Sequence, residues 1–236
     1  MKFVLSFSGG KDGILALHEL TQAGHEPVAL LVMYRREEGR SWVHGLDEGV
    51  LSDVAEALGL PLILGEMEDG DYAKGMEAAL RRAKELGAQA CAFGDIDTPG
   101  HREWDEARCA AVGLEPLLPL WGRDREELAR RTLGLGYRCI IKCVQTGVLP
   151  EEWLGQPLTP ALLEEMKALG ADPCGENGEY HTVVTDGPLF RRPVELANRG
   201  IVRLEHTTAA DLVLRFGTEP VPEEPDRVKV KYGLVE

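Results

Sequence analysis

The stretch that decides the fold is FVLSFSGGKDGILAL, which occupies residues 3–17. Its first part, residues 3–7, is a short and mainly apolar run, which predicts a buried strand. Its last part places Ile14, Leu15 and Leu17 at helical spacing, so a helix is predicted to follow. The glycines between them allow the main chain to turn tightly with positive φ. A strand, a glycine-rich turn and a helix in this order are typical of an α/β protein.

The turn at residues 8–13 is predicted to bind phosphate. Its glycines leave backbone N–H groups uncovered at a helix N-terminus, where orphan donors and the helix dipole favour an anion. Ser8 adds a hydroxyl and Lys11 a positive charge. Asp12 would repel a bare phosphate, so it is expected to cap the helix or to hold a magnesium ion. The alternative, an ordinary strand-to-helix turn, leaves the joint presence of these three side chains unexplained.

Strands and helices alternate over the first 144 residues, which predicts a parallel sheet with helices on both faces. Ligands in such folds sit beyond the C-terminal ends of the strands, so the informative loops follow Phe7, Tyr34, Phe93 and Trp121. Further strands are predicted at residues 27–34, 60–65, 90–95, 115–121 and 137–144, and helices at 46–58, 72–86, 103–112 and 125–133.

After residue 144 the alternation stops. A helix is predicted over residues 159–169, and two short strands are predicted between residues 194 and 216. We therefore predict a first domain over residues 1–144, a smaller α+β subdomain over residues 145–218 and a tail over residues 219–236, with a last strand at residues 228–230.

Composition narrows the class of protein. With 236 residues and 44% hydrophobic residues, the chain is predicted to be folded and globular. A net charge of −14 argues against non-specific binding of nucleic acid, which depends on neutralising phosphates. No apolar run is long enough to span a bilayer and no signal-peptide pattern occurs, so no membrane partner is expected. Five cysteines without paired spacing favour reduced thiols in the cytoplasm and argue against structural zinc.

A second signal is CGENGEYHT at residues 174–182. Its glycines let the backbone approach a ligand, and the carboxylates of Glu176 and Glu179 could bind an amine, hold a metal or move protons. The alternative is a glycine-rich hairpin with exposed polar side chains. A histidine such as His181, taken by itself, is more often a hydrogen-bonded structural residue than a base.

Taken together, the two signals resemble the diphthine–ammonia ligase family of N-type ATP pyrophosphatases, or PP-loop enzymes. The resemblance covers roughly residues 1–190. One departure is Gly13, where the family usually has serine, so the backbone or Ser6 must supply the missing phosphate contact. The matching pieces are SGGKD at residues 8–12, FGDI at 93–96, Arg102, Trp104, Cys109, PLW at 119–121, LG at 154–155, CGE at 174–176, GEYHT at 178–182 and DGP at 186–188.

The resemblance implies a Rossmann-like fold of the HUP type, with ATP bound by residues 1–144 and the acceptor by residues 145–218. It also implies ATP-dependent amidation, with ATP and Mg²⁺ as cofactors and ammonium as the second substrate. The acceptor would be elongation factor 2 carrying diphthine, a modified histidine. Its carboxylate would be adenylated with loss of pyrophosphate, and ammonia would then displace AMP.

Roles for individual residues follow from the same resemblance. Gly94 and Asp95 correspond to the second nucleotide loop near the α-phosphate, and backbone groups near Met33 and Tyr34 would lie against adenine. A glutamate would orient ammonium and take a proton as it attacks. The residues implied to hold the departing pyrophosphate are Ser8, Gly9, Gly10, Lys11, Asp12 and Gly13, and those implied to act in catalysis are Lys11, Asp12, Asp95, Glu176, Glu179 and His181.

Two other functions stay open. One is a PP-loop ATP pyrophosphatase that acts on a different carboxylate, or on a thiolation or RNA substrate. The other is an adenine-nucleotide sensor without catalysis, which Gly13 favours and the second carboxylate cluster disfavours. A homo-oligomer also stays open, although core packing accounts for Trp121 and Trp153 better than an interface does.

Overall fold

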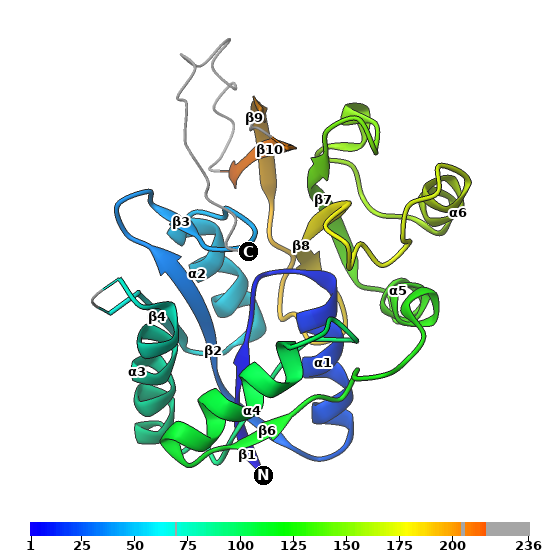
Figure 1. The fold of residues 1–236 in the computed structure, drawn as a ribbon. Helices are drawn as coiled ribbons and strands as arrows, with labels where there is room; N and C mark the ends of the chain where they lie inside the picture. Colours follow the sequence, from blue (N-terminus) through cyan, green and yellow to red (C-terminus); the bar gives the residue numbers. More distant parts are fainter. Residues whose placement is uncertain (69, 204–205, 216–236) are drawn as a thin grey trace.

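The computed structural model describes residues 1–68, 70–203 and 206–215, and Figure 1 shows their arrangement. A parallel sheet has the order β4-β2-β1-β5-β6, and β3 pairs antiparallel with the end of β2. The elements of this part are β1 (Lys2–Ser6), α1 (Lys11–Gln22), β2 (Glu26–Arg35), β3 (Arg40–Ser41), α2 (Glu48–Leu58), β4 (Leu62–Gly65), α3 (Tyr72–Glu85), β5 (Ala90–Ala92), α4 (His101–Val112), β6 (Glu115–Leu117) and α5 (Arg125–Gly134).

Helices cover both faces of the parallel sheet, as predicted. Side chains alternate along β1, so Phe3 and Leu5 pack in the cluster that contains α1 and α2, while Val4 packs in the cluster that contains α3 and α4. All three side chains are fully buried. A strand buried on both faces reads as a continuous apolar run, which is why the sequence pattern identified β1.

A second, antiparallel sheet of order β8-β7-β10-β9 follows. The strand predicted at residues 137–144 was expected to extend the parallel sheet, and this expectation is wrong, because β7 pairs with β8 and β10. An apolar run specifies burial but not which strand will lie beside it. The elements of this part are β7 (Arg138–Gln145), the 3₁₀ turn η1 (Glu151–Trp153), α6 (Pro160–Ala168), β8 (Tyr180–Asp186), β9 (Leu196–Arg203) and β10 (Thr207–Leu214).

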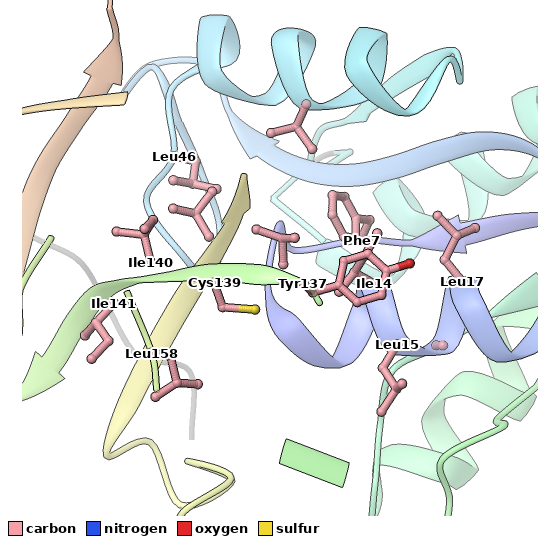
Figure 2. Packing of buried hydrophobic residues seen from close by; sticks show 14 of the residues in the cluster. Phe7, Ile14, Leu15, Leu17, Leu46, Tyr137, Cys139, Ile140, Ile141 and Leu158 are labelled. Atoms are coloured by element: carbon pink, nitrogen blue, oxygen red, sulfur yellow. The ribbon is translucent and has the colours of Figure 1, made fainter. Parts of the chain in front are cut away.

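One hydrophobic cluster joins the two sheets. Figure 2 shows Phe7, which directly follows β1, and Ile14 of α1 beside Tyr137, with Cys139 of β7 next along the chain, and all four belong to the same cluster. The division at residue 144 stays a prediction, and the strand predicted at residues 228–230 lies outside the described residues. No helix among the described residues is both long enough and apolar enough to cross a bilayer.

Candidate active site

A cavity of about 990 Å³ lies where the ends of β1 and β5 meet the start of β8. This volume suits a small-molecule site. Of the predicted site residues, Gly9, Met33 and Glu179 do not line it. Those that line it are Ser6, Ser8, Gly10, Lys11, Asp12, Gly13, Gly94, Asp95, Glu176 and His181. Tertiary structure thus brings three loops from distant parts of the chain into one site.

The turn after β1 presents the N-terminus of α1 to the cavity. Gly10 caps α1 without a side-chain hydrogen bond, and Gly9 before it has a φ of +94°, which favours glycine. The Lys11 N–H donates to Thr182 Oγ1 at 3.1 Å. The next two N–H groups, of Asp12 and Gly13, stand in the first helical turn, where backbone donors lack intrahelical acceptors. The turn has the donors that a phosphate requires.

Lys11 and Asp12, the first two residues of α1, form an ion pair. Lys11 is only 4% exposed, and its Nζ donates to the two Asp12 carboxylate oxygens at 2.7 and 3.0 Å. Burial lowers the pKa of Lys11, but Asp12 and its other neighbours outweigh burial and hold that pKa well above its ordinary value. Lys11 is therefore positively charged at neutral pH. Asp12 does not cap α1, because the N-cap is Gly10.

Two glycines allow close approach inside the site. A Cβ on Gly94 would lie 2.9 Å from the backbone carbon of Asp12, so only glycine lets the loop after β5 contact α1. A Cβ on Gly13 would lie 2.8 Å from Phe7 Cδ2. Phe7 thus fills the space that a serine at position 13 would need, which gives a physical reason for the departure from the PP-loop pattern.

Asp95 pairs with a histidine that the sequence did not single out. Its Oδ1 lies 2.5 Å from Nδ1 of His101, the first residue of α4, and both residues line the cavity. The hydrogen bond to Asp95 raises the pKa of His101 above its ordinary value. His101 begins α4, six residues after Asp95. The sequence could not predict this contact, because it depends on the path of the loop between the two residues.

Glu176 is the acid that faces the cavity from the second motif. Its pKa is raised to about 7, mainly by burial and also by the nearby Asp12, while Lys11 and Arg125 act in the opposite direction. A carboxylic acid with a pKa near neutral exchanges protons readily at physiological pH. Glu176 therefore has the property that a general base needs.

Glu179, which the resemblance implies to act in catalysis, does not line the cavity. Its side chain is 6% exposed, and its oxygens accept the backbone N–H of Asp172 at 3.0 Å and of Asn177 at 3.1 Å. A further bond from Asn177 Nδ2 is 3.0 Å long. Burial raises the pKa of Glu179, but these donors outweigh burial and hold it below its ordinary value. The carboxylate of Glu179 holds the loop at residues 172–177 together.

His181 packs against a second histidine, His44, that was not predicted. The two rings have centroids 4.7 Å apart, and both residues line the cavity. Burial lowers the pKa of His181 to about 4, with help from Lys11. Burial, His181 and Lys11 hold the pKa of His44 well below its ordinary value. These lowered pKa values leave both imidazoles neutral at pH 7.

Acidification is expected to destabilise the fold through His181. Its folded pKa lies below its unfolded value of about 6.5, so its stabilising contribution is complete above pH 6.5 and is lost as pH falls towards 4, by about 3 kcal/mol. In urea unfolding, the stability gap between wild type and His181→Asn should shrink over this range. If the difference in unfolding free energy between wild type and His181→Asn did not change with pH, His181 would not be a buried neutral imidazole. His101→Asn is the control, because its raised pKa predicts the opposite slope.

Met33 does not line the cavity among the described residues, and its C=O accepts the Trp42 N–H at 2.9 Å. The adenine contact near Met33 and Tyr34 stays a prediction. Three aromatic side chains that contact one another, Trp42, Tyr72 and Trp104, are among the residues that line the cavity. Trp104 belongs to the resemblance, whereas the other two carried no sequence signal because they come from a loop and a helix start that are distant in sequence.

Arg125 ties the two acidic loops of the cavity together. It donates to Asp97 at 2.6 Å through Nη2 and to Asp172 at 2.7 Å through Nη1. Asp172 in turn accepts the backbone N–H of Cys174 at 2.8 Å and of Glu176 at 3.2 Å. Arg125 thereby positions Glu176 without lining the cavity itself.

Arg125→Lys is expected to lower turnover about 10- to 100-fold with little change in ATP affinity, because lysine cannot bridge both carboxylates and a shift of about 1 Å costs this much. The matched control is Arg130→Lys on the same helix, which pairs with Glu126 and Glu164 on the surface. Steady-state kinetics of both variants measure the effect. Wild-type turnover in Arg125→Lys would contradict the positioning role.

A cation could be held near Asp12. Ligand atoms of Asp12, Cys174 and Glu176 lie within 4.8 Å of one another. Carboxylate oxygens suit Mg²⁺, whereas a thiol does not, and burial holds the pKa of Cys174 well above its ordinary value. Mg²⁺ is commonly held by one or two carboxylates together with substrate phosphates, so Asp12 fits such a site.

Comparison with known proteins identifies relatives for nearly the whole described chain. The family described as "Diphthamide synthase N-terminal domain" matches residues 1–116, and "Diphthamide synthase C-terminal domain" matches residues 124–210. The diphthine–ammonia ligase of Bos taurus is 31% identical over 228 residues, which cover 86% of this chain and 85% of that protein. The enzyme of the same name from Danio rerio is 29% identical, covering 92% and 94%.

A solved structure also aligns with the chain. It is described as the crystal structure of a predicted subunit of tRNA methyltransferase from Methanocaldococcus jannaschii. The sequence identity is 15% and the TM-score is 0.44, over 80% of this chain and 98% of that one.

Proposed function

Because the chain belongs to the diphthamide synthase family, we propose that it adenylates the carboxylate of diphthine and lets ammonia displace AMP. The coarser activity, ATP-dependent amidation in diphthamide synthesis, is that of its named relatives. The acyl-adenylate, the products AMP and pyrophosphate, and elongation factor 2 as acceptor are the proposed parts.

The observation that carries the proposal is the shared cavity. The loop at residues 8–13, the Asp95 loop and Glu176 all line it. If a nucleotide bound its phosphates at the start of α1, its α-phosphate would lie in the same cavity as Glu176. Glu176 is the acid of the second motif whose pKa is raised. Adenylation and attack by an amine need this proximity.

In the first step, a carboxylate oxygen attacks the α-phosphorus and the bond from that phosphorus to the bridging oxygen breaks. Pyrophosphate leaves with the electron pair of the broken bond. Lys11 and the N–H groups at the start of α1 would stabilise the charge that grows on it. Asp12 would hold Mg²⁺, which spreads negative charge on the phosphates when bound.

In the second step, the ammonia nitrogen attacks the acyl carbon, and AMP leaves as the C–O bond breaks. The nitrogen must lose one proton to become an amide. Glu176 would accept it, because its pKa of about 7 leaves a useful ionised fraction at neutral pH. Asp95, paired with His101, lies in the same cavity and would orient the nucleotide near its α-phosphate.

The test uses purified protein, α-labelled ATP with magnesium, [¹⁵N]ammonium and elongation factor 2 that carries diphthine. A matched reaction omits the factor. The proposal predicts labelled AMP only in the presence of the factor, together with ¹⁵N in a new amide by mass spectrometry. ATP that binds but is never cleaved would support a sensor. AMP released equally with and without the factor would point to a different acceptor.

The reduced state of the cysteines supports a cytoplasmic location, where the proposed acceptor would be found. All five are buried and free of disulfides. Reduced thiols are usual in that compartment.

A further inference from the structure

The loop at residues 42–46 covers the glycine turn that precedes α1. Ser41 closes this loop, because its N–H donates to the Leu46 C=O at 2.7 Å and its hydroxyl accepts the Leu46 N–H at 3.0 Å. Leu46 and His44 lie directly on the two glycines of the turn. A Cβ on Gly9 would lie 2.6 Å from Leu46 Cδ1, and a Cβ on Gly10 would lie 2.6 Å from His44 Cε1. The His44 ring is therefore held over the N-cap of α1.

One nitrogen of the His44 ring has no partner. His44 is 9% exposed and lines the cavity, and its Nδ1 makes no hydrogen bond among the described residues. A hydrogen bond to the backbone of Thr182 acts to raise the pKa of the ring, so the ring donates an N–H there. In a neutral imidazole only one nitrogen carries a proton, which leaves a lone pair on Nδ1. A buried polar atom without a partner is costly, so its presence in the cavity points to a ligand.

The surroundings of this nitrogen favour a negatively charged ligand. His181 on β8 and Lys11 on α1 both lower the pKa of His44, and Lys142 on β7 acts in the same direction. Neighbours that are positive, or become positive, have this effect. Lys11 is paired with Asp12 but stays charged. Together with the N–H groups at the start of α1, these cationic neighbours make this end of the cavity suitable for an anion.

We propose that His44 binds the terminal phosphates of the nucleotide through Nδ1 and takes up a proton from solvent as they bind. The identity of the anion as the end of ATP rests on the proposed function, whereas the anion contact itself does not. With the second proton, both ring nitrogens donate, one to Thr182 and the other to a phosphate oxygen. The phosphates supply the counter-charge that makes the cationic ring favourable.

This contact gives His44 a part in the release of pyrophosphate. The protonated ring is a second cation beside Lys11, at the place where negative charge grows as the bond to the α-phosphorus breaks. When pyrophosphate dissociates, the ring returns its proton to solvent and becomes neutral again. The site therefore binds the charged product without holding a permanent second charge.

The test measures binding of inorganic pyrophosphate with magnesium, and of AMP, by isothermal titration calorimetry at about pH 6.5, the ordinary pKa of histidine. His44→Phe keeps a ring over Gly10 but removes both nitrogens. It should weaken pyrophosphate binding about 10- to 100-fold and leave binding of AMP, which lacks the terminal phosphates, unchanged. His44→Asn keeps an amide near the position of Nδ1 and should recover part of the affinity.

Proton uptake is the measurement that a merely structural role of His44 would not change. Titrations in buffers of different ionisation enthalpy give the number of protons taken up on binding. Wild type should take up about one proton more than His44→Asn, because asparagine cannot be protonated. This difference cancels protons that pyrophosphate itself gains or loses. His25→Asn is the matched control, because Nδ1 of His25 also lacks a partner among the described residues but His25 does not line the cavity.

Two results would overturn the proposal. One is wild-type affinity for pyrophosphate in His44→Phe, and the other is equal proton uptake in wild type and His44→Asn. Thermal unfolding shows whether each variant folds, and if His44→Phe does not, the comparison of wild type with His44→Asn still decides. Failure of the proposed amidation would appear separately, as absence of AMP in the labelled-ATP assay while pyrophosphate binding still depends on His44.

Discussion

Replacing Glu176 with glutamine is expected to slow amide formation by about 10²- to 10⁴-fold while ATP–pyrophosphate exchange stays near the wild-type rate. Glutamine keeps the shape of the side chain but cannot take a proton. Adenylation needs no proton transfer from ammonia, so only the second step should be affected. The two rates are measured separately, by exchange of labelled pyrophosphate into ATP and by mass of the amide product.

Glu179→Gln is the matched control for this experiment. Glu179 lies three residues after Glu176, and its substitution is the same change from acid to amide. The carboxylate of Glu179, however, accepts hydrogen bonds from N–H donors inside the loop at residues 172–177. Its replacement should lower stability by about 1–3 kcal/mol without separating the two steps. An equal loss of exchange and amidation in Glu176→Gln would contradict the base and indicate a ligand of the nucleotide or its metal.

Replacing Lys11 with methionine is expected to lower ATP–pyrophosphate exchange by about 10²- to 10³-fold. Methionine has a similar length, but it removes the charge that would stabilise the departing pyrophosphate. Lys11 is buried and paired with Asp12, so the variant also leaves that carboxylate without its partner. The exchange rate and the affinity for a non-hydrolysable ATP analogue are the measurements.

Lys74→Met, on the exposed surface of α3, controls for loss of a lysine as such. Thermal unfolding of Lys11→Met separates loss of chemistry from loss of fold. If the folded variant exchanges pyrophosphate at the wild-type rate, Lys11 does not contact the phosphates. Lys11→Arg should recover part of the activity, because the charge is kept in a wider and less mobile group.

Much of the α/β part could be predicted from sequence because its signals are local. The apolar run of β1 and the helical spacing after residue 13 depend on neighbours only a few residues apart. The loop between them could be assigned to phosphate because a helix N-terminus has free donors wherever it occurs. The observed element ends differ from prediction by a few residues, as at β5, which ends at Ala92 before the close approach at Gly94.

Long-range pairing could not be predicted in the same way. The run at residues 137–144 was correctly identified as a strand, but the sheet that receives it depends on β8 and β10, which come later in the chain. The roles of Glu176 and Glu179 could not be separated either. Both residues are glutamates, and only the fold distinguishes them. Glu179 accepts hydrogen bonds from backbone N–H groups, whereas Glu176 lines the cavity.

Local sequence patterns were sufficient to predict the order of strands and helices in the first part, a phosphate-binding turn and a second polar motif. Only the tertiary structure decided which side chains meet. It placed His44 against His181, Asp95 against His101, Phe7 in the space of a missing serine and three aromatic rings along one cavity. The physical reason is that local structure depends on steric and hydrogen-bonding preferences of neighbouring residues. Burial, partners and pKa shifts depend on residues that only the folded chain brings together.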